Sequence, residues 1–151
     1  MHISAKSDYA VRALLSLAAA EPDLVKAEVI ARDQALPRKF VEAILADLRR
    51  AGIVRTQRGV EGGYALARPA REITLGQVLR AVDGPLAEVH GLRPHETTGE
   101  GVAEYLPMVW VAMRAALRQV LDETTLAHVL SGRLPRQVKR MAADPTAWLP
   151  R

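Results

Sequence analysis

The 151-residue chain contains no cysteine, so it forms no disulfides and offers no thiol nucleophile. Aromatic residues are scarce as well: they make up 4% of the chain, although 49% of it is hydrophobic. Alanine and leucine supply most of that apolar content. This composition favours a helical protein with a modest core.

Long hydrophobic runs are also missing. No apolar stretch approaches the roughly 18 residues that a membrane-spanning helix needs, so no membrane partner is expected. The segment 1–6 lacks the basic and apolar regions of a secretory signal, and a cytoplasmic location is therefore expected. The length fits one domain, or a small domain with an extension.

Negative charge is scarce in the middle of the chain. The net charge is +4 overall, and residues 38–80 alone hold 9 Lys and Arg against 4 Asp and Glu. Residues 81–151 hold 8 of each sign. A basic excess on one segment is expected for a surface that contacts nucleic-acid phosphates. The same excess is also found on charged surfaces that contact only water. The local structure around residues 38–80 decides between the two.

A helix-turn-helix is predicted in the first third of the chain. A helix over 7–20 is followed by a short helix over 27–33, a tight turn and a helix over 38–51. In the last of these, apolar residues recur at helical spacing, and Gly52 provides the C-terminal stop. Its opposite face carries charged and alanine side chains, which suits a helix that lies against a partner surface. Short helix, turn and amphipathic helix form the helix-turn-helix pattern.

A β-hairpin with a long tip is predicted next. Stretches at 53–56 and 64–66 favour β-structure and flank the loop 57–63, which contains three glycines. Glycine has no Cβ, so such a loop bends sharply and approaches another surface closely. Arg58 lies in the tip. A patterned helix followed by a basic-tipped hairpin predicts a winged helix-turn-helix, a mainly α fold with a small β-hairpin wing. Double-stranded DNA is the expected partner.

The second half of the chain is predicted to be helical on either side of a long loop. Thr74 and Gln77 form a capping box that starts a helix, and Gly84-Pro85 ends it. Residues 86–103 have no periodicity and are predicted to form a sensor loop. A long helix follows over 104–122. Its apolar residues recur at spacings of three and four, which predicts a dimerisation seam made of Leu106, Val109, Trp110, Met113, Leu117, Val120 and Leu121.

The chain therefore divides into four parts. We expect a DNA-binding domain at 1–85, the sensor loop at 86–103, dimerisation and C-terminal helices at 104–143, and a tail at 144–151. Packing of the long helix on its own domain is the alternative to dimerisation. A domain this small offers little surface to bury such a seam, so two-fold pairing is favoured.

Several stretches resemble the Rrf-two family of bacterial transcription regulators, the IscR, NsrR and CymR type. The stretches are Ser7–Leu14, Val41–Val54, Arg58–Leu66, Glu72–Leu75 and Val82–Leu86. The resemblance covers about residues 3–130 and is strongest up to residue 86. No single motif is decisive, but the ordered combination is specific.

The resemblance implies a homodimer that binds a palindromic operator as a repressor. It also implies that the helix over 38–51 is the reading helix and that its start lies in the major groove. The tip of the wing, the hairpin over 53–66, then enters the minor groove. At the matching positions of this sequence, Arg38, Lys39 and Glu42 are nominated for the major groove. Arg58, next to Gln57, is nominated for the minor groove. A carboxylate such as that of Glu42 can accept a hydrogen bond from the cytosine amino group.

This chain departs from the family at the sensor. Iron–sulfur members carry three cysteines between the Gly-Pro-Leu segment and the Trp-containing helix, where this chain has residues such as His90, Gly91, Thr97 and Glu104. Because thiolates hold such clusters, no iron–sulfur cluster and no other cofactor is expected. A metal-responsive regulator that uses His90 and His95 is an alternative, since nitrogen and oxygen ligands lie close in sequence. A small molecule or a protein is the other kind of effector.

Two further classes of function fit the sequence less well than DNA binding. The spacing Gly59-x-x-Gly62-Gly63 is neither a dinucleotide fingerprint nor a P-loop, and no histidine lies near a recognisable serine or carboxylate motif. The chain is therefore not expected to be an enzyme. A winged helix that serves only as a protein-interaction adaptor predicts a wing without phosphate affinity, and the basic excess in 38–80 argues against it.

Overall fold

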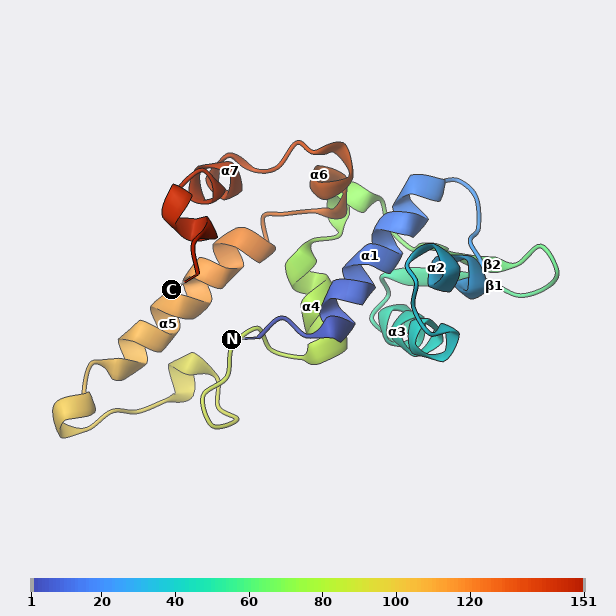
Figure 1. The fold of residues 1–151 in the computed structure, drawn as a ribbon. Helices are drawn as coiled ribbons and strands as arrows, with labels where there is room; N and C mark the ends of the chain where they lie inside the picture. Colours follow the sequence, from blue (N-terminus) through green and yellow to red (C-terminus); the bar gives the residue numbers. More distant parts are fainter. Residues whose placement is uncertain (1, 151) are drawn as a thin grey trace.

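The computed structural model describes residues 2–150. Its elements are α1 (Ala5–Ala20), α2 (Ala27–Asp33), α3 (Arg38–Arg50), β1 (Val54–Gln57), β2 (Gly63–Leu66), η1 (Ala70–Glu72), α4 (Leu75–Asp83), η2 (Pro94–Glu96), η3 (Gly101–Ala103), α5 (Leu106–Leu121), α6 (Leu126–Ser131), α7 (Arg136–Ala142) and η4 (Pro145–Trp148). Helices α1, α2 and α3 lie beside the hairpin, and α4 packs against α1 and α3 on the side away from it (Figure 1). Helix α5 leads away from these helices, and α7 returns beside α5. The predicted class, mainly α with a small β-hairpin, is confirmed.

Capping side chains set where two helices begin. The Ser4 hydroxyl oxygen accepts from the Ser7 amide, so α1 starts at Ala5, two residues before the predicted start. Thr74 and Gln77 form the predicted reciprocal capping box at the start of α4. No helix within residues 2–150 is long and apolar enough to cross a membrane.

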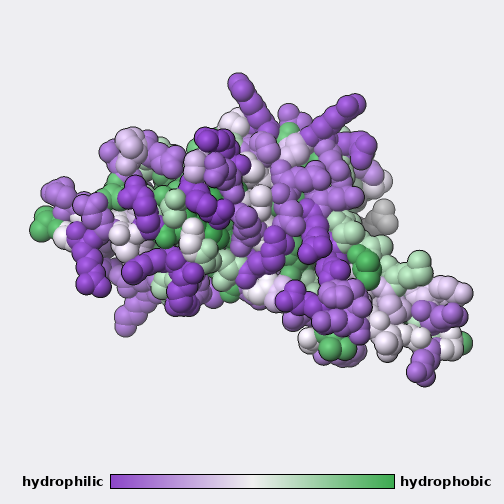
Figure 2. Space-filling view, turned by 180° about the vertical axis from the view of Figure 1, so that it is seen from behind, coloured by the Kyte–Doolittle hydropathy of each residue, from purple (hydrophilic) through white to green (hydrophobic). Residues whose placement is uncertain are grey.

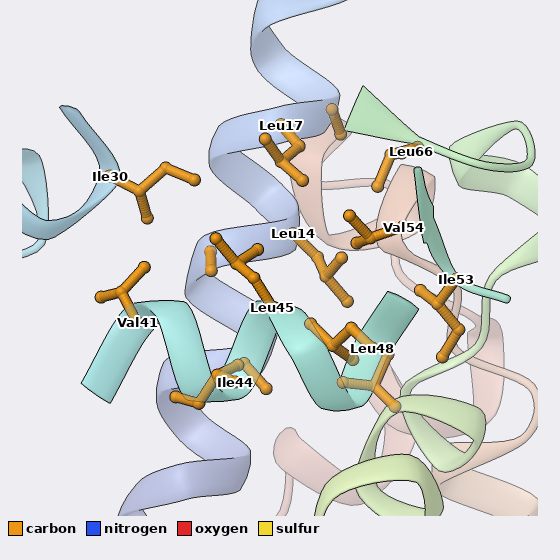
Figure 3. Packing of buried hydrophobic residues seen from close by; sticks show 14 of the residues in the cluster. Leu14, Leu17, Ile30, Val41, Ile44, Leu45, Leu48, Ile53, Val54 and Leu66 are labelled. Carbon is orange, nitrogen blue, oxygen red and sulfur yellow. The ribbon is translucent and has the colours of Figure 1, made fainter. Parts of the chain in front are cut away.

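One apolar cluster joins α1, α3 and the hairpin (Figure 3). The buried residues of α3 have the predicted helical spacing and are Val41, Ile44, Leu45 and Leu48. Leu14 of α1 points toward this row, whereas Leu17 lies on the side of Leu66. Val54 of β1 and Leu66 of β2 add the hairpin to the same cluster. Helix α3 and the hairpin are therefore held by a common core.

The hairpin is also tied to the segment before α2. β1 and β2 are antiparallel, with Gln57 opposite Gly63 at the end of the ladder. The Val25 amide donates to the Tyr64 carbonyl at 2.9 Å, and the Tyr64 amide donates back to the Val25 carbonyl at 2.8 Å. These two bonds fix the base of the wing next to the start of α2.

Close approach of the backbone explains two glycines of the loop. A Cβ on Gly62 would lie 2.2 Å from the Gln57 carbonyl oxygen, and a Cβ on Gly63 would lie 2.9 Å from that of Val25. Gly59 is required for another reason, since its φ of +111° is unfavourable for residues with a side chain. Each glycine of the predicted tip therefore has a structural role.

After α5 the chain returns to the core, which the sequence did not predict. The Leu75 amide donates to the Thr124 carbonyl at 2.8 Å, and the Leu126 amide donates to the Ile73 carbonyl at 3.0 Å. Leu126 is fully buried in the cluster that α1 and α3 form. α6 thus packs on α1, and both ends of α5 are connected to the rest of the molecule.

The segment between α4 and α5 is a loop with short local turns. It contains η2, η3 and a two-residue bridge between Val89 and Leu92. The long helix that follows is present and runs from Leu106 to Leu121, slightly shorter than the predicted 104–122.

Candidate nucleic-acid interface

The start of α3 and the wing face each other across an open groove. Four of the five nominated DNA-contacting residues line it: Arg38, Glu42, Gln57 and Arg58. Lys39 is exposed on the same turn of α3 as Arg38 but does not line the groove. Residues far apart in the sequence are therefore brought together on one surface.

Arg38 is held by two carboxylates. Its Nε donates to Glu42 Oε1 at 2.7 Å, within α3, and its Nη1 lies 3.1 Å from Glu28 Oε1 of α2. The hydrogen bond to Glu42, followed by the charge of Glu28, raises the pKa of Arg38 above its usual value. The guanidinium therefore bridges the two helices of the helix-turn-helix and fixes the orientation of Glu42.

Arg58 and Lys39 are differently placed. Within residues 2–150, no carboxylate lies within salt-bridge distance of either side chain, and both are exposed. Arg58 follows Gln57, the last residue of β1, and stands at the base of the tip. These two cations are thus available to phosphates or to a groove without first breaking an ion pair.

The opposite end of α3 is fixed by Asp47. Lys6 Nζ of α1 lies 2.6 Å from Asp47 Oδ2 and also donates to the Val82 carbonyl at 2.9 Å. Arg50 contacts the other oxygen of Asp47. The Lys6 hydrogen bond is the main cause that lowers the pKa of Asp47. Lys6 therefore connects the reading helix to the C-terminal end of α4.

Two residues of this surface were missed from the sequence. Glu28 and Lys26 lie at the start of α2 and line the groove beside Arg38. The helix-turn-helix pattern contains the signal, because a tight turn brings the first residues of α2 next to those of α3. Neither residue lies on α3 or the wing, where the sequence predicts the DNA contacts.

The nominated dimer residues differ in exposure. Leu121 is buried within its own chain, while Trp110, Met113, Leu117 and Val120 are half-buried and Leu106 and Val109 are exposed. Two further large apolar residues of this region, Tyr105 and Met108, are 70% and 69% exposed.

The geometry defines a winged helix-turn-helix protein of the DNA-binding class. A family model described as "Rrf2: Iron-dependent Transcriptional regulator" matches residues 3–132. An HTH-type transcriptional regulator of Mycobacterium tuberculosis is 47% identical over 145 residues, which is 95% of this chain and 90% of that protein. The chain belongs to the Rrf2 family of transcriptional regulators, the family that its sequence resembles, and it is not an enzyme.

Solved structures agree with this family. CymR, the global cysteine regulator of Bacillus subtilis, superposes with a TM-score of 0.74 at 30% identity, over 87% of this chain and 97% of that one. IscR of T. potens superposes with a TM-score of 0.70 at 29% identity, over 100% of this chain and 93% of that one. The similarity therefore extends over the long helix as well as the winged domain.

The description of the family names iron, but the residues present do not fit an iron–sulfur cluster. No cysteine exists to supply thiolate ligands. Across residues 2–150, no three His, Asp or Glu side chains gather as a metal-binding group. His95 Nδ1 accepts a hydrogen bond from Arg114 Nη1 at 2.8 Å. His90 instead lines a mainly apolar pocket at the start of α5, of which His95 is not a part.

Proposed function

We propose that the chain is a sequence-specific DNA-binding repressor that acts as a homodimer on a palindromic operator in the bacterial cytoplasm, without an iron–sulfur cluster. One observation carries the proposal: Arg38, Glu42, Gln57 and Arg58 line a single groove between the reading helix and the wing. Phosphates and base edges of a duplex present the complementary chemistry.

In this proposal the start of α3 enters the major groove. Arg38 holds the Glu42 carboxylate in place, and Glu42 accepts from a cytosine amino group. Lys39, on the exposed side of the same turn, binds a phosphate. Arg58 inserts into the minor groove, where a narrow A·T-rich stretch concentrates negative potential. Gln57 supports the wing contact from the end of β1.

Dimerisation is proposed to occur through α5. The helix carries large exposed apolar residues, among them Tyr105 at its N-cap, Met108 and Val109. Isologous pairing of two copies buries these residues of one copy against the same residues of the other. It also places two reading helices about one DNA turn apart. Such a dimer on an operator that overlaps a promoter represses by excluding the polymerase.

The test is selection from a randomised duplex library with the full-length protein. We expect a palindromic consensus whose half-sites are separated by about one helical turn, roughly 10 base pairs. The selected duplex should be bound by two copies, with an affinity that falls steeply with salt as counterions are released. Recovery of no consensus, together with salt-independent binding, would favour the protein-interaction adaptor.

A further inference from the structure

The segment 86–103 and the start of α5 line an open pocket of about 300 Å³. Its volume lies at the lower end of the range for small-molecule sites in proteins. The pocket lies at the end of the molecule opposite the wing (Figure 1). In Figure 2, which is seen from behind, this end is at the lower right, where pale and green atoms appear among the purple ones. We propose that it binds a neutral, mainly apolar small molecule that carries one hydrogen-bonding group.

The floor of the pocket comes from α5. Residues 106–113 contain no charged side chain, so this half of the helix is apolar on every face. A helix of that kind is normally covered all round. Leu106, Pro107 and Trp110 face the pocket, whereas Tyr105 and Met108 lie on the other side at helical spacing and are exposed. A second copy that covers the latter side, rather than the seam residues Leu106 and Trp110, leaves the pocket side open to a ligand.

The walls of the pocket set the chemistry of the ligand. The apolar residues are Val89, Leu92, Ala103, Leu106, Pro107 and Trp110. Three polar residues complete the lining, namely His90, Thr97 and Thr98, and no Lys, Arg, Asp or Glu takes part. Burial of a full charge without a partner is costly, so the walls select a neutral molecule.

The polar groups are held in place by local structure. His90 has a φ of +52° and is followed by Gly91 at +80°, in a turn closed by mutual hydrogen bonds between Val89 and Leu92 of 2.9 and 3.0 Å. This is the arrangement of a tight hairpin turn, in which histidine is an unusual occupant of its first position. The Thr97 hydroxyl donates to the Pro94 carbonyl at 2.7 Å, which leaves its oxygen free to accept from a ligand.

The experiment uses fluorine NMR of the full-length protein with para-trifluoromethylphenol as the probe. We expect saturable binding in the millimolar range or tighter. Para-trifluoromethylbenzoate, of similar size but charged, should bind at least about tenfold more weakly, because the walls offer it no cation. Ala103→Phe fills the pocket and should abolish binding, whereas Ala143→Phe adds the same ring at an exposed position near the C-terminus and should leave binding unchanged.

A second variant keeps the result interpretable if Ala103→Phe does not fold. Thr97→Val removes the hydroxyl acceptor at nearly constant volume. It should weaken the phenol about two- to tenfold but leave para-trifluoromethyltoluene, which has no hydroxyl, unaffected. If the substitution weakens the binding of both probes equally, the segment has loosened as a whole, and the assigned role of Thr97 is wrong.

Three results would overturn the proposal. They are absence of phenol binding to the wild type, retention of binding in a folded Ala103→Phe variant, and equal binding of the benzoate. A fourth result, probe binding that appears only on dilution to monomers, would also overturn the proposal, because it would assign the pocket to the second copy. None of these measurements involves DNA, so failure here is separate from failure of the proposed DNA binding.

Discussion

Gly63 lies directly against the backbone of Val25: a Cβ at Gly63 would stand 2.9 Å from the Val25 carbonyl oxygen and 3.0 Å from its carbonyl carbon. The next residue, Tyr64, exchanges two backbone hydrogen bonds with Val25. The wing is thus joined to the segment that leads into α2 at a point where only glycine fits. The wing is therefore held both by this contact and by the apolar core that it shares with α3.

Gly63→Ala should therefore move the wing away from Val25. We expect a loss of about 1–3 kcal/mol in the free energy of unfolding, the range for overpacking a closely packed site. Hydrogen exchange at the Val25 and Tyr64 amides should accelerate, and DNA affinity should fall. Ala67→Ser, at an exposed position just beyond β2, is the control and should change neither measurement. Unchanged exchange in Gly63→Ala would contradict the anchoring role.

Arg58→Ala tests the minor-groove contact. Binding to the selected operator should weaken by about 1–3 kcal/mol, and the slope of log affinity against log salt should decrease by about one. The matched control is Arg133→Ala, which removes the same charge from an exposed position before α7. If both variants bind equally well, Arg58 acts only through net charge and its assigned role is wrong.

Glu28→Gln tests the second carboxylate on Arg38. Removal of its charge leaves Arg38 paired with Glu42 alone and reduces negative charge beside the groove. We expect DNA affinity to rise about two- to fivefold, the effect of one exposed ion pair. Glu123→Gln, at an exposed position beyond α5, should leave affinity unchanged. A fall in affinity would show that Glu28 is needed to orient Arg38 for DNA.

The sequence predicts the local elements of this fold better than the contacts between them. Helical spacing identifies α3, the capping box identifies the start of α4, and three glycines identify the wing, because each of these signals arises from neighbouring residues. The position of Leu126 in the core depends on a contact with residues more than fifty positions away, which no local pattern encodes. Glu28 is a different case: the helix-turn-helix pattern places it near the start of α3, but its ion pair with Arg38 joins two helices and is not part of the spacing of either one.

The exposure of residues along the long helix also depends on contacts between elements, which local spacing does not encode. Spacing alone assigns Leu121 and Val109 to one seam. In the structure Leu121 is buried against its own chain at the end of α5 that contacts α4, whereas Val109 is exposed in the first half of the helix. Periodicity shows that a helix has an apolar face but not which part of it a neighbouring element covers.

Asp47→Asn tests how the reading helix is fixed, through the dependence of stability on pH. Lys6 lowers the pKa of Asp47 below its ordinary value of 3.8. The folded state therefore binds the proton more weakly than the unfolded state, so the stabilisation is present above about pH 4 and is lost as pH falls through the lower folded value. Urea unfolding should show that the wild type loses more stability on acidification than Asp47→Asn does. Asp33→Asn, exposed at the end of α2, is the control and should follow the wild type.

Val109→Glu tests dimerisation through α5. Val109 is 54% exposed in the single chain, so a glutamate there meets solvent in the monomer and should not unfold it. In a dimer that buries this face, the carboxylate is left without a partner, and association should weaken by about 3 kcal/mol or more. Sedimentation velocity should then show monomers at concentrations where the wild type is dimeric. Binding to the palindromic operator should fall with it, while binding to a single half-site should persist.

Met141→Glu provides the matched control for that measurement. Met141 is 47% exposed but lies on α7, outside the proposed interface. The substitution therefore introduces the same charge at an apolar surface position and should leave the dimer intact. Equal dissociation of both variants would show that charge alone weakens the dimer. If Val109→Glu instead dimerises as well as the wild type, the interface lies on another face of the molecule.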